Sequence, residues 1–180
     1  MHSYAVFLRG INVGGVRIGM KDLAEALASA GYANVSTLLA SGNVVLDATS
    51  GDAAAVKTDI EAVLRRRFGY EAWVIVTTPG QLASIVASYP FPAVEDGVAR
   101  HDYVVLAATA EAVQEVLAAC PEPSPGELAA AGEGVLYWQV PRGSSLETRV
   151  ARELGRARHK AVLTTRNMNT LRKVLARMGS

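Results

Sequence analysis

The chain has 180 residues, enough for one large domain or two small ones with a buried core. Half of the residues are hydrophobic and 19% are charged, which excludes a disordered chain. The formal net charge of +1 conceals an asymmetry, because residues 1–141 carry a net charge of −7 and residues 142–180 carry +8. The near-neutral total therefore does not exclude an anionic partner.

The first part of the chain alternates between strand and helix patterns. Short runs of branched and aromatic residues predict the strands, and apolar residues at helical spacing predict the helices. Asp52 is a good helix N-cap and Gly31 a good helix C-cap. The predicted strands are 3–8, 35–39, 44–46 and 72–77, and the predicted helices are 20–30 and 52–68.

The same kind of pattern restarts after a short helix that follows Pro79 and a surface loop at 93–100. We expect a strand at 103–107, a helix at 111–120, a hairpin of strands 128–131 and 135–140, and helices at about 145–157 and 165–178. The last helix is predicted from the spacing of its apolar residues.

A strand-helix-strand-strand-helix-strand order is typical of ferredoxin-like folds. The sequence therefore predicts an α+β protein of two ferredoxin-like βαββαβ-type halves, the second complete or incomplete, with a C-terminal helical extension. The expected divisions are a first half at 1–78, a helix and connecting loop at 79–101, and a second half with basic C-terminal helices at 102–180. The strand runs are apolar at every position, so both sheet faces need cover, from the other half or from another subunit.

Several classes of protein find no support in the sequence. Cys120 is the single cysteine, so no intramolecular disulfide can form, and no metal-ligand spacing or cofactor motif is present. The start of the chain does not have the pattern of a secretory signal, and no apolar run is long enough to span a membrane. We expect a cytoplasmic protein without a membrane partner, a metal or a cofactor.

The first candidate site is the glycine-bearing loop from Arg9 to Gly15, which lies between a predicted strand and a predicted helix. Backbone N–H groups of such a loop can converge on an anion, and Arg9 could bind two oxygens of a phosphate or a carboxylate. The spacing fits neither a P-loop nor a dinucleotide-binding fingerprint. The alternative is a simple turn in which Arg9 pairs with a structural acid.

The second candidate is Ser41-Gly42-Asn43, between two predicted strands. Turn chemistry alone explains this triplet in most proteins, and nothing in the sequence points to a base that would activate Ser41. No catalytic residue can be named on this basis.

The third candidate is the segment Thr164–Thr170, which is predicted to open the last helix with Thr164 or Thr165 as its N-cap. Arg166 would then lie in a first helical turn, where its charge opposes the helix dipole. Either an acidic side chain or a bound anion would hold it there. Asn167, Asn169 and Thr170 add side-chain donors.

The fourth candidate is a basic stripe of Arg149, Arg152 and Arg156 on a predicted helix face, opposite Leu146, Val150 and Leu154. Such a face is usually just solvated, and the acidic first part could neutralise it. It could instead bind RNA or DNA.

Three motifs occur here in one order: Arg-Gly-Ile-Asn-Val-Gly-Gly at 9–15, Ser-Gly-Asn-Val-Val at 41–45, and Thr-Arg-Asn-x-Asn-Thr at 165–170. Together they resemble the bacterial domain-of-unknown-function 1697 family. The resemblance implies a cytoplasmic α+β protein with ferredoxin-like halves and implies no activity. The residues that carry it are polar loop residues, which favours a binding site over packing.

Two functions remain open. In the first, the chain binds a phosphate-bearing ligand, either a nucleotide or a nucleic-acid backbone, at a site formed by the Arg9–Gly15 loop and the Thr165–Thr170 helix start, with Ser41–Asn43 as a third wall. The predicted ligand-binding residues are Arg9, Gly10, Asn12, Gly14, Gly15, Ser41, Gly42, Asn43, Lys160, Arg166, Asn167, Asn169 and Thr170. In the second, the chain is a non-catalytic interaction protein or homo-oligomer, and the motifs only shape turns. Whether it is an enzyme stays open.

Overall fold

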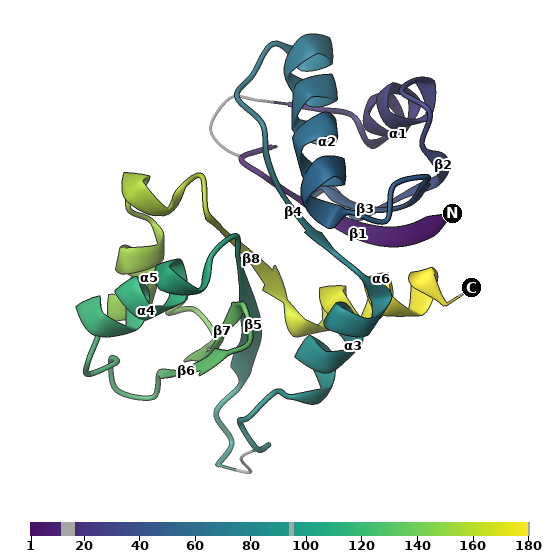
Figure 1. The fold of residues 1–180 in the computed structure, drawn as a ribbon. Coiled ribbons are helices and arrows are strands. Elements are labelled where there is room, and N and C mark those ends of the chain that lie inside the picture. The colour runs from purple at the N-terminus through teal and green to yellow at the C-terminus, as the bar shows by residue number, and fades with distance from the viewer. Residues whose placement is uncertain (12–16, 94–95, 180) are drawn as a thin grey trace. The chain divides into compact units, whose positions relative to one another are not determined.

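The computed structural model describes residues 1–11, 17–93 and 96–179. The chain divides into two compact units, Met1–Ala83 with Arg172–Ser180, and Ser84–Leu171. Figure 1 shows the two four-stranded sheets, one in each unit. The predicted class, α+β with two ferredoxin-like halves, is confirmed.

The first unit has the expected order of elements. They are β1 (His2–Arg9), α1 (Met20–Ser29), β2 (Ala33–Leu38), β3 (Asn43–Ala48), α2 (Ala53–Phe68) and β4 (Trp73–Thr77). The strands lie in the order β2-β3-β1-β4 and every neighbouring pair is antiparallel. This is the strand order that the ferredoxin-like prediction requires.

Helix α2 begins and ends where the sequence predicts. The side chain of Asp52 accepts a hydrogen bond from the backbone N–H of Ala54 at 2.9 Å, which satisfies one unpaired donor of the first turn. Gly69 ends the helix with a left-handed φ of 66°. The buried face carries Val56 and Ile60, which pack into the core of this unit.

Strand β1 is buried on both faces, as its uninterrupted apolar run predicts. Each residue from Tyr4 to Leu8 is at most 1% exposed. One face of the strand, formed by Tyr4, Val6 and Leu8, belongs to a core cluster. This cluster also includes Leu23 of α1 and Ile60 of α2. A central strand buried on two faces lacks the alternation of a half-exposed strand.

The second unit repeats the topology of the first in its own sheet and two of its helices. Helix α3 (Pro79–Ala87) leads into β5 (Arg100–Ala107), α4 (Ala110–Ala119), β6 (Leu128–Gly132), β7 (Val135–Pro141), α5 (Arg149–Leu154), a 3-10 turn (Ala157–His159), β8 (Leu163–Asn167) and α6 (Met168–Met178). The repeated part consists of β5–β8, α4 and α5, whereas α3 and α6 each contribute residues to both units. The strand order β6-β7-β5-β8 matches that of the first sheet. Because β8 supplies the fourth strand, the second half is complete.

The predicted start of the last helix at residue 165 is wrong. Residues Leu163–Asn167 form β8, which pairs with β5 so that Thr165 faces Val105 and Asn167 faces Tyr103. Two consecutive β-branched threonines suit a strand, and the ladder with β5 pairs the backbone groups on one side of this edge segment. The helix starts at Met168, so neither Thr164 nor Thr165 is its N-cap and Arg166 is not in its first turn.

The predicted helix at about 145–157 is also too long. Helix α5 covers only Arg149–Leu154; the side chain of Thr148 accepts a hydrogen bond from the N–H of Ala151, and Gly155 follows the last helical residue. Leu146 lies before the helix and is 87% exposed. Arg156 lies beyond it, so the predicted stripe of three arginines is not one helix face.

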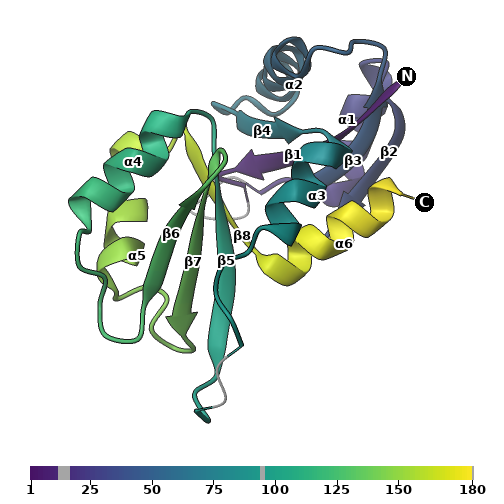
Figure 2. The same cartoon turned by 60° about the horizontal axis from the view of Figure 1, so that its bottom comes forward.

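Figure 2 shows α4 and α5 lying together on one side of the second sheet. Within the parts of the chain that the structure describes, no helix combines the length and the hydrophobicity needed to cross a bilayer.

Candidate functional site

The fold brings the first two predicted motifs together in the first unit. The turn of residues 39–42 joins β2 to β3, and the N–H of Leu8 donates a hydrogen bond to the carbonyl of Gly42 at 2.8 Å. A Cβ added to Gly42 would lie 2.6 Å from Cδ1 of Ile11 and 2.9 Å from Cβ of Leu8. Any larger side chain would have to displace these neighbours, and the φ of 73° also favours glycine. The turn therefore packs directly against the residue that follows Arg9-Gly10.

Asn43 holds this turn in shape. Its side chain is fully buried, and its Nδ2 donates to the carbonyl of Leu38 at 2.8 Å and to Oγ of Ser41 at 2.9 Å. An amide nitrogen has two hydrogens, so both are used inside the turn. The Nδ2 group of Asn43 therefore has a structural role, which agrees with the explanation of this triplet as a turn. Ser41 is exposed at the surface of the turn.

Arg9 is the last residue of β1, in register with Trp73 of β4. The side chain is partly buried, and this burial lowers the pKa of its guanidinium group. Gly10 follows with a φ of 78° and turns the chain out of the sheet. Of the predicted loop residues, Asn12, Gly14 and Gly15 lie outside the described residues.

The third motif is divided between a strand and a helix. Arg166 is only 7% exposed, and its guanidinium donates to Oγ1 of Thr164 at 2.8 Å and to the carbonyl of Thr165 at 2.9 Å. Asn167 caps α6, because its Oδ1 accepts from the backbone N–H of Asn169 at 2.9 Å. Strand alternation places Thr165 and Asn167 on one face of the sheet and Arg166 on the other.

The basic segment has carboxylate partners within its own unit. The guanidinium of Arg149 lies 3.8 Å from Oε2 of Glu122 and donates to the carbonyl of the same residue at 2.9 Å. Arg156 lies 2.8 Å from Oε2 of Glu153. Arg152 has no ion pair among the described residues. Two of the three predicted stripe arginines are therefore already paired with acids, and the exposed Lys160 lies after the 3-10 turn.

The sequence patterns did not indicate the buried pair of Glu153 and His159. Glu153 is 3% exposed and His159 is fully buried, and their Oε1 and Nε2 atoms are 2.8 Å apart. Arg158 also donates to Glu153. Burial alone would raise the pKa of the Glu153 carboxyl, but the hydrogen bond from His159 and the charges of Arg156 and Arg158 outweigh it and hold that pKa below its usual value. Six residues of sequence separate the pair, and only the bend after α5 brings them together.

The described residues offer no constellation that would bind a metal, since no three of their histidine, cysteine, aspartate and glutamate side chains converge. Within them, the first two predicted motifs meet where the turn of residues 39–42 packs against Leu8 and Ile11, in the segment that also carries the partly buried Arg9.

The family model for proteins of unknown function designated DUF1697 matches residues 1–137. The chain belongs to the DUF1697 family. A solved structure of a conserved bacterial protein from Streptococcus pneumoniae aligns with a TM-score of 0.78 over 98% of each chain, at 22% sequence identity. This likeness shows that the DUF1697 chain has the same fold as the Streptococcus pneumoniae protein.

An unknown protein from Galdieria sulphuraria aligns with a TM-score of 0.28 and 14% identity, over 98% of this chain and 91% of that one. No curated protein matches the DUF1697 chain.

Proposed function

We propose that this DUF1697 protein binds a phosphate-bearing small molecule on its first unit, at Arg9 and the turn that carries Ser41-Gly42. The observation that carries the proposal is the packing of Gly42 against Ile11, with 2.6 Å from an added Cβ to the Ile11 side chain. This packing places the turn against the chain segment that continues from Arg9, so that both lie at the same end of β1.

The chemistry of the two groups supports an anionic ligand. A guanidinium can donate two parallel hydrogen bonds to a phosphate, and the partial burial of Arg9 strengthens such bonds because less water competes for them. The hydroxyl of the exposed Ser41 accepts from Nδ2 of Asn43, and a serine hydroxyl can also donate to a phosphate oxygen. Asn43 acts by holding the turn.

The ion pairs formed by arginines of the basic C-terminal segment, residues 142–180, favour a small ligand over nucleic acid. A nucleic-acid interface needs many unpaired cations along the backbone. Arg149 and Arg156, two of the arginines predicted for that role, are within ion-pair distance of Glu122 and Glu153. The predicted contributions of Arg166, Asn167, Asn169, Thr170 and Lys160 remain predictions.

The test is thermal unfolding with phosphate, pyrophosphate, ATP and a short RNA. We expect a ligand at ten times its Kd to raise the melting temperature by about 3–6 °C. Arg9→Ala should fold and lose this increase. Arg66→Ala, an exposed arginine on α2 of the same unit, should keep it. If none of the phosphate compounds shifts the wild type, the proposal fails; a shift with RNA alone would indicate the nucleic-acid alternative.

The alternative, an interaction or oligomerisation protein, is supported by Arg152, which is exposed on α5 and forms no ion pair with any residue that the structure describes. Charge reversal by Arg152→Glu should then weaken self-association in sedimentation experiments. An unchanged sedimentation coefficient would count against it.

A further inference from the structure

The first half of β5 is much less buried than its second half. Arg100 to Tyr103 are partly exposed, whereas Val104 to Leu106 are buried. Helix α4 has 10 residues, about 15 Å at 1.5 Å per residue, whereas the 8 residues of β5 span roughly 26 Å. Figure 2 shows α4 beside the end of β5 from which the chain enters the helix. Helix α4 therefore does not reach the beginning of β5, whose residues stay partly exposed.

A row of aromatic side chains occupies this partly exposed beginning of β5 and the neighbouring strand. Tyr103 stacks on Trp138 of the neighbouring strand β7, with ring centroids 5.0 Å apart and an interplanar angle of 26°. His101 lies two residues earlier on the same face, with its ring centroid 5.6 Å from that of Tyr103. Trp138 is buried and its indole N–H donates to Oε1 of Glu127 at 2.8 Å. The buried tryptophan thus fixes the orientation of the partly exposed tyrosine.

Asn167 lies on the other side of Tyr103. The two residues are opposite each other in the β5–β8 ladder, and β8 is the edge strand of its sheet. A directly opposite pair has Cβ atoms about 4.5–5.5 Å apart on the same face. The Oδ1 of Asn167 caps α6, which directs its Nδ2 donor away from the backbone of that helix. A short polar side chain therefore stands beside the ring of Tyr103.

We infer that Tyr103, with Asn167 and His101, forms a binding site for a planar heteroaromatic ring of the nucleobase class. The ring stacks on the face of Tyr103 that Trp138 does not cover and lies above Asn167. The Nδ2 group of Asn167 donates to an oxygen or nitrogen at the edge of the ligand ring. Aromatic stacking of this kind accepts any base, because every base has a π-face.

This site lies wholly in the second unit and does not depend on the proposed phosphate site. Thr165 and Asn167 share its face, whereas Arg166 points to the opposite face of the sheet. One residue of the third motif, Asn167, is thereby assigned to ring recognition. The ligand probes are chosen without phosphate, so that failure here leaves the phosphate proposal untouched.

The experiment uses the W73F chain, in which Trp138 is the single tryptophan. Adenosine and uridine should quench the Trp138 fluorescence saturably, and ribose should not. Tyr103→Phe should keep the affinity within about twofold, and Tyr103→Leu should lower it roughly fivefold or more. Asn167→Asp keeps the oxygen that caps α6 and replaces the donor, so it should weaken binding about threefold to tenfold.

Calorimetric titration of the unsubstituted chain with adenosine provides an independent measurement. The inference is overturned if neither nucleoside binds saturably in either assay. It is also overturned if the leucine and phenylalanine variants bind equally well. Arg9→Ala should bind adenosine normally, which separates this site from the proposed phosphate site. If Tyr103→Leu does not fold, the Asn167→Asp result decides.

Discussion

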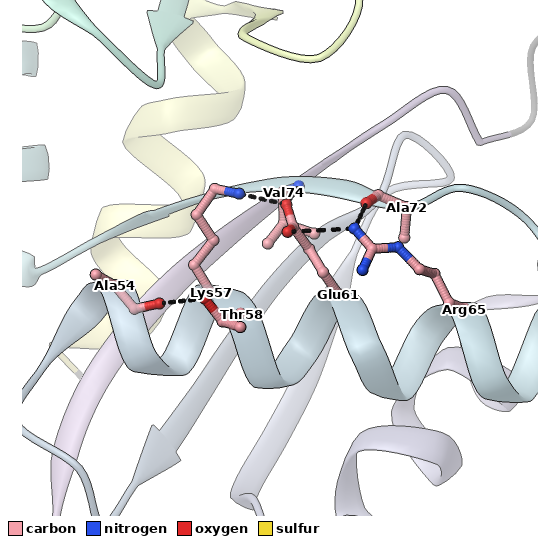
Figure 3. A network of polar contacts seen from close by, with 7 residues as sticks. All are labelled: Ala54, Lys57, Thr58, Glu61, Arg65, Ala72 and Val74. Atoms are coloured by element: carbon pink, nitrogen blue, oxygen red, sulfur yellow. Dashed lines mark hydrogen bonds and ion pairs between the residues drawn. The ribbon is translucent and has the colours of Figure 1, made fainter.

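The carboxylate of Glu61 accepts a hydrogen bond from the backbone N–H of Val74 at 3.0 Å, so a helix side chain serves as a partner for the edge strand β4. The same Oε1 atom accepts from Nζ of Lys57 at 2.5 Å, and Oε2 lies 3.6 Å from the guanidinium of Arg65 (Figure 3). That guanidinium also donates to the carbonyl of Ala72 at 3.5 Å. Helix α2 and strand β4 are thus joined by polar contacts as well as by apolar packing.

Glu61→Ala should lower the free energy of unfolding by about 1–3 kcal/mol, because it leaves the Val74 N–H without its acceptor. Glu61 is 7% exposed, so water does not easily replace the carboxylate. Urea unfolding measures the difference. Glu25→Ala is the matched control, since Glu25 pairs with Lys21 at the same spacing but is exposed, and it should cost less than about 1 kcal/mol. Equal losses in both variants would contradict the role of Glu61.

Gly42→Ala should destabilise the protein by more than the cost of a left-handed φ alone. The new Cβ would meet Ile11 and Leu8 at 2.6 and 2.9 Å, in addition to the strain of a φ of 73°. Gly69→Ala is the control, because Gly69 has a φ of 66° and nothing within 4 Å of its Cβ position. We expect a loss of about 1 kcal/mol in the control and about 2–4 kcal/mol at Gly42. Thermal unfolding of both variants would refute this if the losses were the same.

The free energy of unfolding should depend on pH in the acidic range because of Glu153. The pKa of its carboxyl lies below the ordinary value of 4.5 in the folded protein. The stabilisation is therefore present above pH 4.5 and is lost as the pH falls through the lowered pKa. Glu153→Gln should be less stable than the wild type at pH 7, and the difference should shrink below pH 4.5. A difference that is constant with pH would exclude this linkage.

The thiol of Cys120 should be unreactive in the folded protein. Burial raises its pKa, and the charges of Glu153 and Glu127 raise it further. Iodoacetamide at pH 8 should alkylate the folded chain at least about tenfold more slowly than the urea-unfolded chain, because only the thiolate reacts. Mass spectrometry reports one adduct without ambiguity, since the chain has one cysteine. Equal rates in the two states would show that the site is open to solvent.

Most of the fold follows from local patterns. The apolar run of β1, the N-cap Asp52 of α2 and the spacing of the buried face of α2 each specify an element within a few residues. The candidate site was less accessible to such reasoning. The sequence placed polar residues in turns, but the contact between Gly42 and Ile11 arises from the pairing of β1 with β3, whose residues are far apart in the chain.

Residues 163–170 show where local reasoning stops. Their composition suits either a capped helix or a strand, and the N-cap propensity of Thr164 and Thr165 placed Arg166 in the first turn of a predicted helix. Pairing with β5, some sixty residues upstream, makes Thr164 to Asn167 a strand. Strand alternation then sends Arg166 and Asn167 to opposite faces.

The distribution of charge is likewise determined in part by the sequence and in part by the fold. Sequence alone establishes that residues 1–141 are acidic and residues 142–180 basic, because charge is a property of each residue type. Which charges meet depends on the folded chain: Arg149 reaches Glu122 across 27 residues, and Glu153 collects Arg156, Arg158 and His159 around a buried carboxylate. Composition sets the number of charges, and distance and burial, which arise only on folding, set the strength of their interactions.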